Sequence, residues 1–190
     1  YGTEVFGLTP DLITVAKGVT SAYVPLSASL VSESMWQVLA QGSDHYGVFG
    51  HGYTYTAHPL AAAAALTNLA IIERDGLVEQ AGKRGQYLRQ RLHERFDDHP
   101  LVGEVRGEGL IAAVELVRSR SPQEPFDPTL RVGARVANES RRRGVITRAL
   151  PAADIFAFSP PFIVTEAEID EMVEVTLSAL DAVAAELAKE

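Results

Sequence analysis

Cysteine is absent from the 190-residue sequence, and its absence excludes two classes of site. A chain without thiols has no disulfide framework and no thiolate-bound metal. Basic residues are also few, because 17 Lys and Arg stand against 25 Asp and Glu, for a net charge of −8. A surface of that sign does not attract nucleic acid or an anionic membrane, and neither is predicted as a partner.

Long apolar runs and a targeting pattern are missing as well. No uninterrupted hydrophobic stretch is long enough to cross a bilayer, and we find no signal peptide. Hydrophobic residues make up 46% of the chain and charged residues 22%, the usual balance of a globular protein with a real core. The chain opens "YGTEVFGLTPDL" without a methionine. We therefore expect a soluble, cytoplasmic protein of which this sequence is one part.

The first 75 residues predict strands that alternate with helices. In order, the pattern predicts a strand at 12–16, a turn and strand within 21–32, a helix at 33–41, a glycine-rich stretch at 42–59 and a helix at 59–74. The first strand is apolar throughout and is expected to be covered on both faces. Pro59 suits the first turn of its helix, and Asp75-Gly76 suits the end. Alanines in that helix predict close packing against other backbone.

The remaining residues predict a smaller α+β unit. The expected elements are a helix at about 77–96, a glycine turn plus strand within 102–117, a polar loop at 119–128, a helix from Asp127-Pro128 to about 143, strands in "VITRAL" and "IFAFSPP", and a final helix. Leu88, Leu92 and Phe96 form an apolar stripe, and Thr165 with Glu168 forms a capping box. The stripe predicted for the final helix is Ile169, Met172, Val173, Thr176, Leu180, Val183 and Leu187.

Lys17 follows the first predicted strand directly, in "LITVAKG". From spacing alone, a solvated lysine at a strand end is the simpler interpretation. The functional alternative is a lysine that forms a Schiff base with a carbonyl cofactor, which requires partial burial so that the free amine exists. The small neighbours Ala16 and Gly18 would let a planar ring approach the backbone closely.

The stretch "GHGYTYTAHP" (residues 50–59) places glycines and hydroxyl groups just before a helix. Such groups suit a phosphate, although a turn with capping threonines explains an isolated glycine-rich stretch equally well. His51 and His58 are seven residues apart with no carboxylate in register, so we interpret them as hydrogen-bonding groups. No metal site is predicted.

Arg148 lies among apolar residues in "GVITRAL". Burying a guanidinium is costly unless it is paired, and its planar fork matches a carboxylate. One interpretation is therefore a substrate carboxylate site. The competing interpretation is an edge-strand arginine paired with Glu115 or another internal acid.

The motifs "PDLITVAKG", "YVPLSA", "GHGYTYTAHP", "VRGEGL", "GVITRA" and "SPPFIVTEAEIDEM", in that order, resemble the class III, or ω-, aminotransferases that use pyridoxal phosphate. The resemblance runs along essentially the whole chain. It implies the α/β fold of the type I pyridoxal-phosphate-dependent transferases. Residues 1–75 would be the C-terminal part of the large cofactor-binding domain, and residues 76–190 the small C-terminal α+β domain.

By this resemblance, Lys17 matches the lysine that forms the Schiff base and moves the proton between substrate and cofactor. Thr54 matches the threonine that binds the cofactor phosphate of the partner subunit, and Tyr53 occupies an aromatic position beside the same site. Arg148 matches the arginine that holds the carboxylate of a keto-acid acceptor in the amine–pyruvate branch. The resemblance thus implies a homodimer or larger assembly acting on a small amine and a keto acid.

Part of the family's site has no match in this sequence. The carboxylate for the pyridine nitrogen, the glycine-serine phosphate loop and the ring-stacking aromatic residue would all lie upstream of residue 1, so we expect the chain alone to be inactive.

Amine:pyruvate transamination is the preferred activity. The alternatives are a 4-aminobutyrate or diamine aminotransferase, a glutamate-semialdehyde-type aminomutase, a decarboxylase, a noncatalytic oligomerisation remnant, and a structural domain with a chance lysine.

Overall fold

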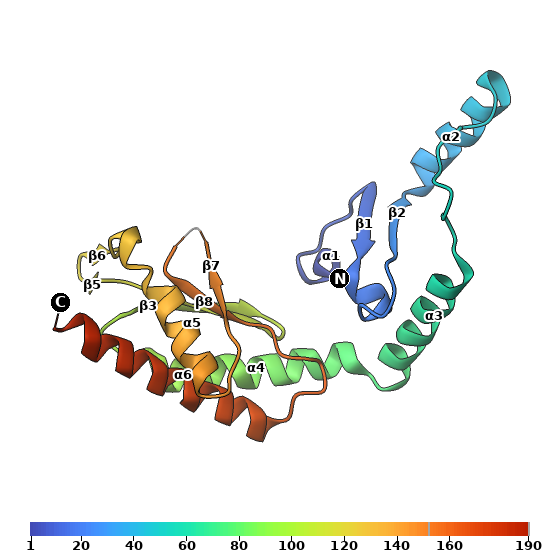
Figure 1. Ribbon diagram of the computed structural model, residues 1–190. Coiled ribbons are helices and arrows are strands. Elements are labelled where there is room, and N and C mark those ends of the chain that lie inside the picture. The colour runs from blue at the N-terminus through green and yellow to red at the C-terminus, as the bar shows by residue number, and fades with distance from the viewer. Residues whose placement is uncertain (152, 190) are drawn as a thin grey trace. The chain divides into compact units, whose positions relative to one another are not determined.

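Two compact units make up the chain. The computed structural model describes residues 1–151 and 153–189, and it divides into Tyr1–Asp75 and Gly76–Glu190, called unit 1 and unit 2 below (Figure 1). The hydrophobic core lies in unit 2. That unit 1 is the C-terminal part of a large domain, and unit 2 a complete small domain, stays a prediction.

Unit 1 contains a two-stranded antiparallel ribbon and three helices. Its elements are α1 (Gly2–Val5), β1 (Leu12–Ala16), the 3-10 turn η1 (Lys17–Thr20), β2 (Ser27–Val31), α2 (Glu33–Tyr46) and α3 (Pro59–Arg74). β1 pairs with β2 from Leu12 opposite Val31 to Ala16 opposite Ser27. η1 lies in the connection between the two strands, and α3 packs against it.

The prediction that β1 is covered on both faces is wrong within this chain. Every residue of β1 is exposed or half-buried, and Leu12 is 57% exposed. In all of unit 1 the buried residues are Thr20, Ala61 and Ala65. A two-stranded ribbon has no further strand or helix layer of its own to cover its faces, so an apolar strand sequence does not guarantee burial.

The helix predicted at 33–41 is longer than expected. α2 continues to Tyr46 and ends at Gly47, whose φ is +89°. Gly42 lies inside the helix, where a glycine weakens but does not end helical structure. Ser32 caps the start, because its side chain accepts a hydrogen bond of 3.4 Å from the Met35 N–H.

α3 follows the prediction at both ends. Pro59 is its first residue, and the preceding His58 caps it by accepting a 3.3 Å hydrogen bond from the Leu60 N–H. The helix ends at Arg74, before Asp75. Ala61 and Ala65 are buried while α3 packs against η1, which confirms the close backbone approach predicted from the alanines.

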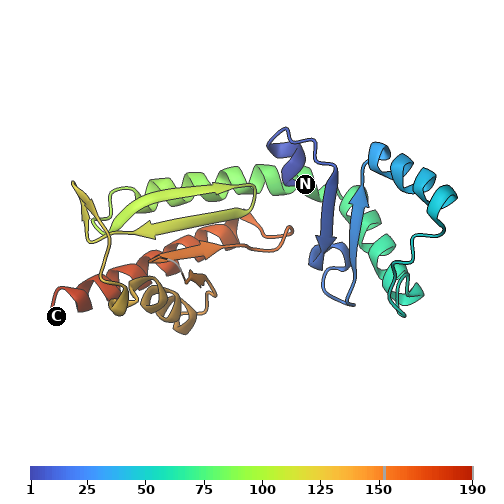
Figure 2. The same ribbon diagram turned by 90° about the horizontal axis from the view of Figure 1, so that it is seen from above.

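Unit 2 is a four-stranded antiparallel sheet with helices on one face (Figures 1 and 2). Its elements are α4 (Leu77–Phe96), β3 (Val102–Glu108), β4 (Ile111–Leu116), β5 (Ser119–Arg120), β6 (Gln123–Glu124), η2 (Pro128–Leu130), α5 (Val132–Arg142), β7 (Arg148–Leu150), β8 (Ile155–Phe158) and α6 (Glu166–Leu187). The strand order is β3-β4-β8-β7, which leaves β7 at an edge. Along β4 the buried residues alternate with more exposed ones, as in a sheet with one covered face.

The core of unit 2 forms between the sheet and the apolar stripes of its helices. Leu88, Leu92 and Phe96 of α4 are each 0% exposed, and the Phe96 and Phe156 rings lie 6.0 Å apart, which confirms the predicted stripe. On α6 the predicted stripe is buried or packed against the core along its length. No helix among residues 1–151 and 153–189 is both long and apolar enough to span a bilayer.

The predicted helix from Asp127-Pro128 is interrupted. Asp127 does cap a turn, accepting a 2.9 Å hydrogen bond from the Thr129 N–H, but that turn is the short 3-10 helix η2. Arg131 then takes a left-handed conformation (φ +48°), and α5 begins only at Val132. The capping box at Thr165 and Glu168 is confirmed, with both reciprocal hydrogen bonds present.

Gly85 of α4 lies against the turn between β3 and β4. A Cβ at this position would be 1.9 Å from the Gly109 carbonyl oxygen, which is backbone and cannot move aside alone. We predict that Gly85→Ala lowers the free energy of unfolding of unit 2 by about 1–3 kcal/mol or more, since the helix must shift from the sheet. The measurement is chemical denaturation followed by circular dichroism.

Gly82→Ala is the matched control on the same helix, because a Cβ there meets nothing within 4 Å. It should leave stability unchanged or raise it by about 0.5–1 kcal/mol through helix propensity. Equal effects of the two substitutions would contradict the close packing of α4 on the hairpin.

His99 links pH to the stability of unit 2. Burial lowers the pKa of His99 below its usual value, and the Asp181 carboxylate, 3.4 Å from Nε2, opposes that shift only in part. The unfolded chain therefore binds the proton more readily, so stability is present above about pH 6.5 and falls as pH drops below it. We predict that His99→Asn weakens this pH dependence, as measured by unfolding midpoints between pH 7.5 and 5.5. An unchanged slope would contradict the role of His99.

Candidate functional site

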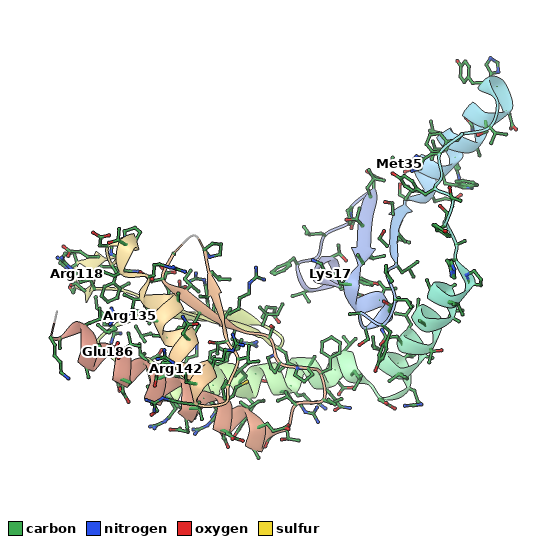
Figure 3. All side chains as sticks on the ribbon, in the orientation of Figure 1. Lys17, Met35, Arg118, Arg135, Arg142 and Glu186 are labelled. Atoms are coloured by element: carbon green, nitrogen blue, oxygen red, sulfur yellow. The ribbon has the colours of Figure 1, made fainter. Side chains whose placement is uncertain are left out.

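Lys17 is the first residue after β1 and the first residue of η1, at the end of the ribbon (Figure 3). This is the strand-end position that the sequence predicted. Its φ of +52° lies in the left-handed region, which is unusual for a residue with a side chain. The side chain is exposed. The partial burial expected for a Schiff-base lysine is therefore not provided by the described residues of this chain.

Hydrogen bonds close the turn that follows Lys17. The Ala22 N–H donates to the Lys17 carbonyl at 3.4 Å, and the Ser21 N–H donates to the Gly18 carbonyl at 3.2 Å. The Thr20 hydroxyl donates to the Val24 carbonyl at 2.6 Å, and Thr20 itself is 1% exposed. Thr20 thus anchors the turn from inside unit 1.

Asn68 of α3 holds the other side of this turn, although it lies in none of the motifs that predicted the site. Its side-chain Nδ2 donates to the Gly18 carbonyl at 2.8 Å and to the Val19 carbonyl at 3.1 Å. Asn68 follows Ala61 by seven residues and Ala65 by three, so all three lie on one helix face. A polar asparagine on the helix face of small apolar residues is the sequence signal that could have identified Asn68 as a contact to other backbone.

Tyr53 and Thr54 lie in an exposed turn before α3. The Thr56 N–H donates to the Tyr53 carbonyl at 2.9 Å, and the Tyr53 N–H donates to the Thr56 hydroxyl at 3.0 Å. Thr54 lies between these two residues with its side chain exposed, and Tyr53 is 79% exposed. The ring of His51 packs edge-on against Tyr53, with centroids 5.5 Å apart.

Arg148 opens the edge strand β7 of unit 2, opposite Ala157 of β8. The edge position agrees with one sequence interpretation, but the proposed pairing with Glu115 is wrong. Glu115 instead accepts a 2.6 Å hydrogen bond from Arg106 across the β3–β4 pair. Among the described residues, the ion pairs include none to Arg148.

A hollow of about 430 Å³ lies beside β7, and Arg148 contributes to its lining with Thr147, Ser159 and Glu168. The Glu168 carboxylate is committed elsewhere, because it accepts hydrogen bonds from the N–H and hydroxyl of Thr165. These hydrogen bonds, the backbone one above all, hold the pKa of the Glu168 carboxyl below its usual range. Glu168 is thus engaged with Thr165, and Arg148 has no ion pair among the described residues. A carboxylate that entered this hollow would meet the Arg148 guanidinium without a competing charged partner.

The sequence profile of the family described as Aminotransferase class-III matches residues 1–180. The chain belongs to the class III aminotransferases. The matched range includes all of unit 1, with Lys17, Tyr53 and Thr54, and unit 2 as far as residue 180, with Arg148.

Relatives with different substrate names resemble the chain over nearly its full length. It is 46% identical over 190 residues to a diaminobutyrate–2-oxoglutarate transaminase of Halomonas elongata, covering all of this chain and 40% of the relative. It is 38% identical over 186 residues to a putrescine–pyruvate aminotransferase of Pseudomonas aeruginosa, covering 97% of this chain and 39% of the relative. The chain therefore spans about two-fifths of the length of these curated relatives.

A solved transaminase structure confirms the fold. A transaminase from a study of directed evolution by ancestral reconstruction superposes with a TM-score of 0.95 and 55% identity, covering 97% of this chain and 40% of that one. The fold is thus that of the type I transferases, as the sequence predicted.

Proposed function

We propose that the protein containing this chain is a pyridoxal-phosphate-dependent transaminase that moves an amino group from an amine or ω-amino acid to a keto acid, with pyruvate as the preferred acceptor. The observation that carries the proposal is Lys17, the only lysine of unit 1, placed at a strand end in a tightly hydrogen-bonded turn. Family membership supports the reaction class.

Lys17 would attach the cofactor and move the proton. Its primary amine can add to the aldehyde carbon of pyridoxal phosphate with loss of water. With a substrate amine bound in its place, the Nζ of Lys17 would be the group that accepts the proton from the substrate α-carbon. Bound pyridoxal phosphate supplies an electron sink that stabilises the negative charge left at that carbon.

The residues present fit two parts of the cofactor. Lys17 supplies the amine for the aldehyde, and the hydroxyl of Thr54, exposed in its turn, is suited to a phosphate. We propose that Thr54 binds the phosphate in the partner subunit of a homodimer, with Tyr53 bordering that site. The high exposure of both residues in the single chain is what such a role requires.

Arg148 would bind the carboxylate of the acceptor. Its position on an edge strand, its lack of an ion pair among the described residues, and the hollow beside it support this role. A guanidinium can bind a carboxylate through two parallel hydrogen bonds.

A 2-oxoglutarate-dependent diamine or 4-aminobutyrate aminotransferase is the second candidate. The observation that favours it is the name of the Halomonas elongata relative, which includes 2-oxoglutarate. The two candidates differ in whether the acceptor has one carboxylate or two, so acceptor preference separates them directly.

We further propose a cytoplasmic location, and that residues 1–190 alone are inactive. The exposure of Lys17 supports the second point, because the described residues of this chain do not enclose a cofactor around its amine. The chain alone is therefore a useful control beside the full-length protein.

We predict that borohydride reduction of the full-length protein with pyridoxal phosphate places the label on Lys17, as read by peptide mass spectrometry. Hydride adds to the C=N bond, and a solvent proton completes the stable secondary amine. Lys17→Arg should abolish labelling and transamination, whereas Lys83→Arg, at a lysine paired with Glu79 on the surface, should change neither. A folded protein labelled elsewhere, or not at all, would favour the noncatalytic oligomerisation remnant.

We predict that Arg148→Leu raises the KM for pyruvate about 10–100-fold, as expected for losing a hydrogen bond to a charged group. The KM of an uncharged amine donor should stay within about twofold, because that donor has no carboxylate. Steady-state kinetics with pyruvate and 2-oxoglutarate as separate acceptors provide the measurement.

Arg142→Leu is the matched control for this substitution, since Arg142 is an exposed arginine on α5 (Figure 3). An unchanged KM for both acceptors in Arg148→Leu would remove the arginine from the acceptor site. A larger effect on 2-oxoglutarate than on pyruvate would favour the second candidate.

A further inference from the structure

The turn after Lys17 concentrates left-handed backbone. Among the described residues, five that are not glycine have a positive φ, and three of them, Lys17, Ser21 and Ala22, lie within this six-residue segment. This conformation brings Cβ too close to the following carbonyl oxygen, so residues with side chains avoid it. It persists only where surrounding contacts impose it.

Asn68 makes the side-chain contact that fixes the backbone just after Lys17. An amide group has two N–H donors, and the two nearest acceptors of Nδ2 are the successive carbonyls of Gly18 and Val19. Two neighbouring carbonyls held by one group fix the orientation of two consecutive peptide planes. These are the Gly18–Val19 and Val19–Thr20 planes, which begin one residue after Lys17, so Asn68 limits the path by which the chain leaves Lys17.

Helix formation alone does not explain an asparagine at this position. Asn is a weaker helix former than Ala or Leu, and residue 68 lies in the interior of α3. The buried residues on its face, Ala61 and Ala65, have no polar side-chain atoms to pair with it. Its amide is instead directed across to η1, fifty residues earlier in the chain.

We propose that Asn68 is a positioning residue for Lys17. By holding the carbonyls of Gly18 and Val19, it fixes the turn that Lys17 opens and so the direction in which the Lys17 amine would meet the aldehyde of the cofactor. This inference rests on the proposed role of Lys17. The buried Thr20 anchors the turn, and Asn68 sets its orientation relative to α3. Small errors in the direction of an attacking group lower reaction rates strongly.

The test uses the full-length protein without cofactor, to which pyridoxal phosphate is added. The rate at which Lys17 becomes attached is followed by quenching with borohydride and quantifying the Lys17 peptide. We expect Asn68→Ala, which removes both donors, to slow attachment about tenfold, the effect of one to two hydrogen bonds. Asn68→Asp keeps the size but replaces the donors with a carboxylate, and should slow attachment at least as much.

Two controls separate positioning from folding. Thr67→Ala changes the neighbouring exposed residue of α3 and should leave the rate unchanged. Asn68→Gln retains the amide and should restore part of the rate. A second readout is the pH titration of the absorption spectrum of the attached cofactor, which should shift in Asn68→Ala because the attached nitrogen is held in a different direction. A stability change alone would not move this titration.

The outcomes distinguish this inference from the proposed function. If the wild type is not labelled at Lys17, the proposed function fails whatever the variants do. If Lys17 is labelled and Asn68→Ala matches the wild type in rate and titration, the positioning inference fails while the proposed function stands. Failure of both Asn68→Ala and Asn68→Asp to fold, judged by circular dichroism, would also overturn it, because Asn68 would then be a structural residue.

Discussion

A lysine in a left-handed backbone conformation must be held there, and this constraint organises the part of unit 1 around the candidate site. The carbonyls after Lys17 meet the amide of Asn68, and the small side chains of Ala61 and Ala65 let α3 approach closely enough for that amide to reach them. Packing and hydrogen bonding therefore depend on each other here. A larger residue at either alanine would move the donor away from the turn.

The two units differ in how far they bury their own apolar surface. Unit 2 has a core in which α4, α6 and the sheet share fully buried side chains. Unit 1 buries Thr20, Ala61 and Ala65, and most of the large apolar side chains that the described residues leave exposed belong to it. This distribution fits a unit that functions within a larger assembly, as the proposed homodimer requires.

Features set by neighbouring residues could be predicted from the sequence. Pro59 begins α3, Thr165 and Glu168 cap α6, and Leu88, Leu92 and Phe96 point into the core, because each depends on spacing within a helical turn. Predictions that needed a distant partner were less reliable. The described residues do not provide the cover expected for β1, and Glu115 pairs with Arg106 and not with Arg148.

The sequence by itself determined the family, the fold and the places of Lys17, Tyr53, Thr54 and Arg148 along the chain, because these depend on the order and spacing of residues. Only the tertiary structure decided which groups hold the turn after Lys17. The contact between Asn68 and the turn after Lys17 joins residues fifty positions apart. No local pattern specifies such a contact, since it exists only once α3 has packed against η1.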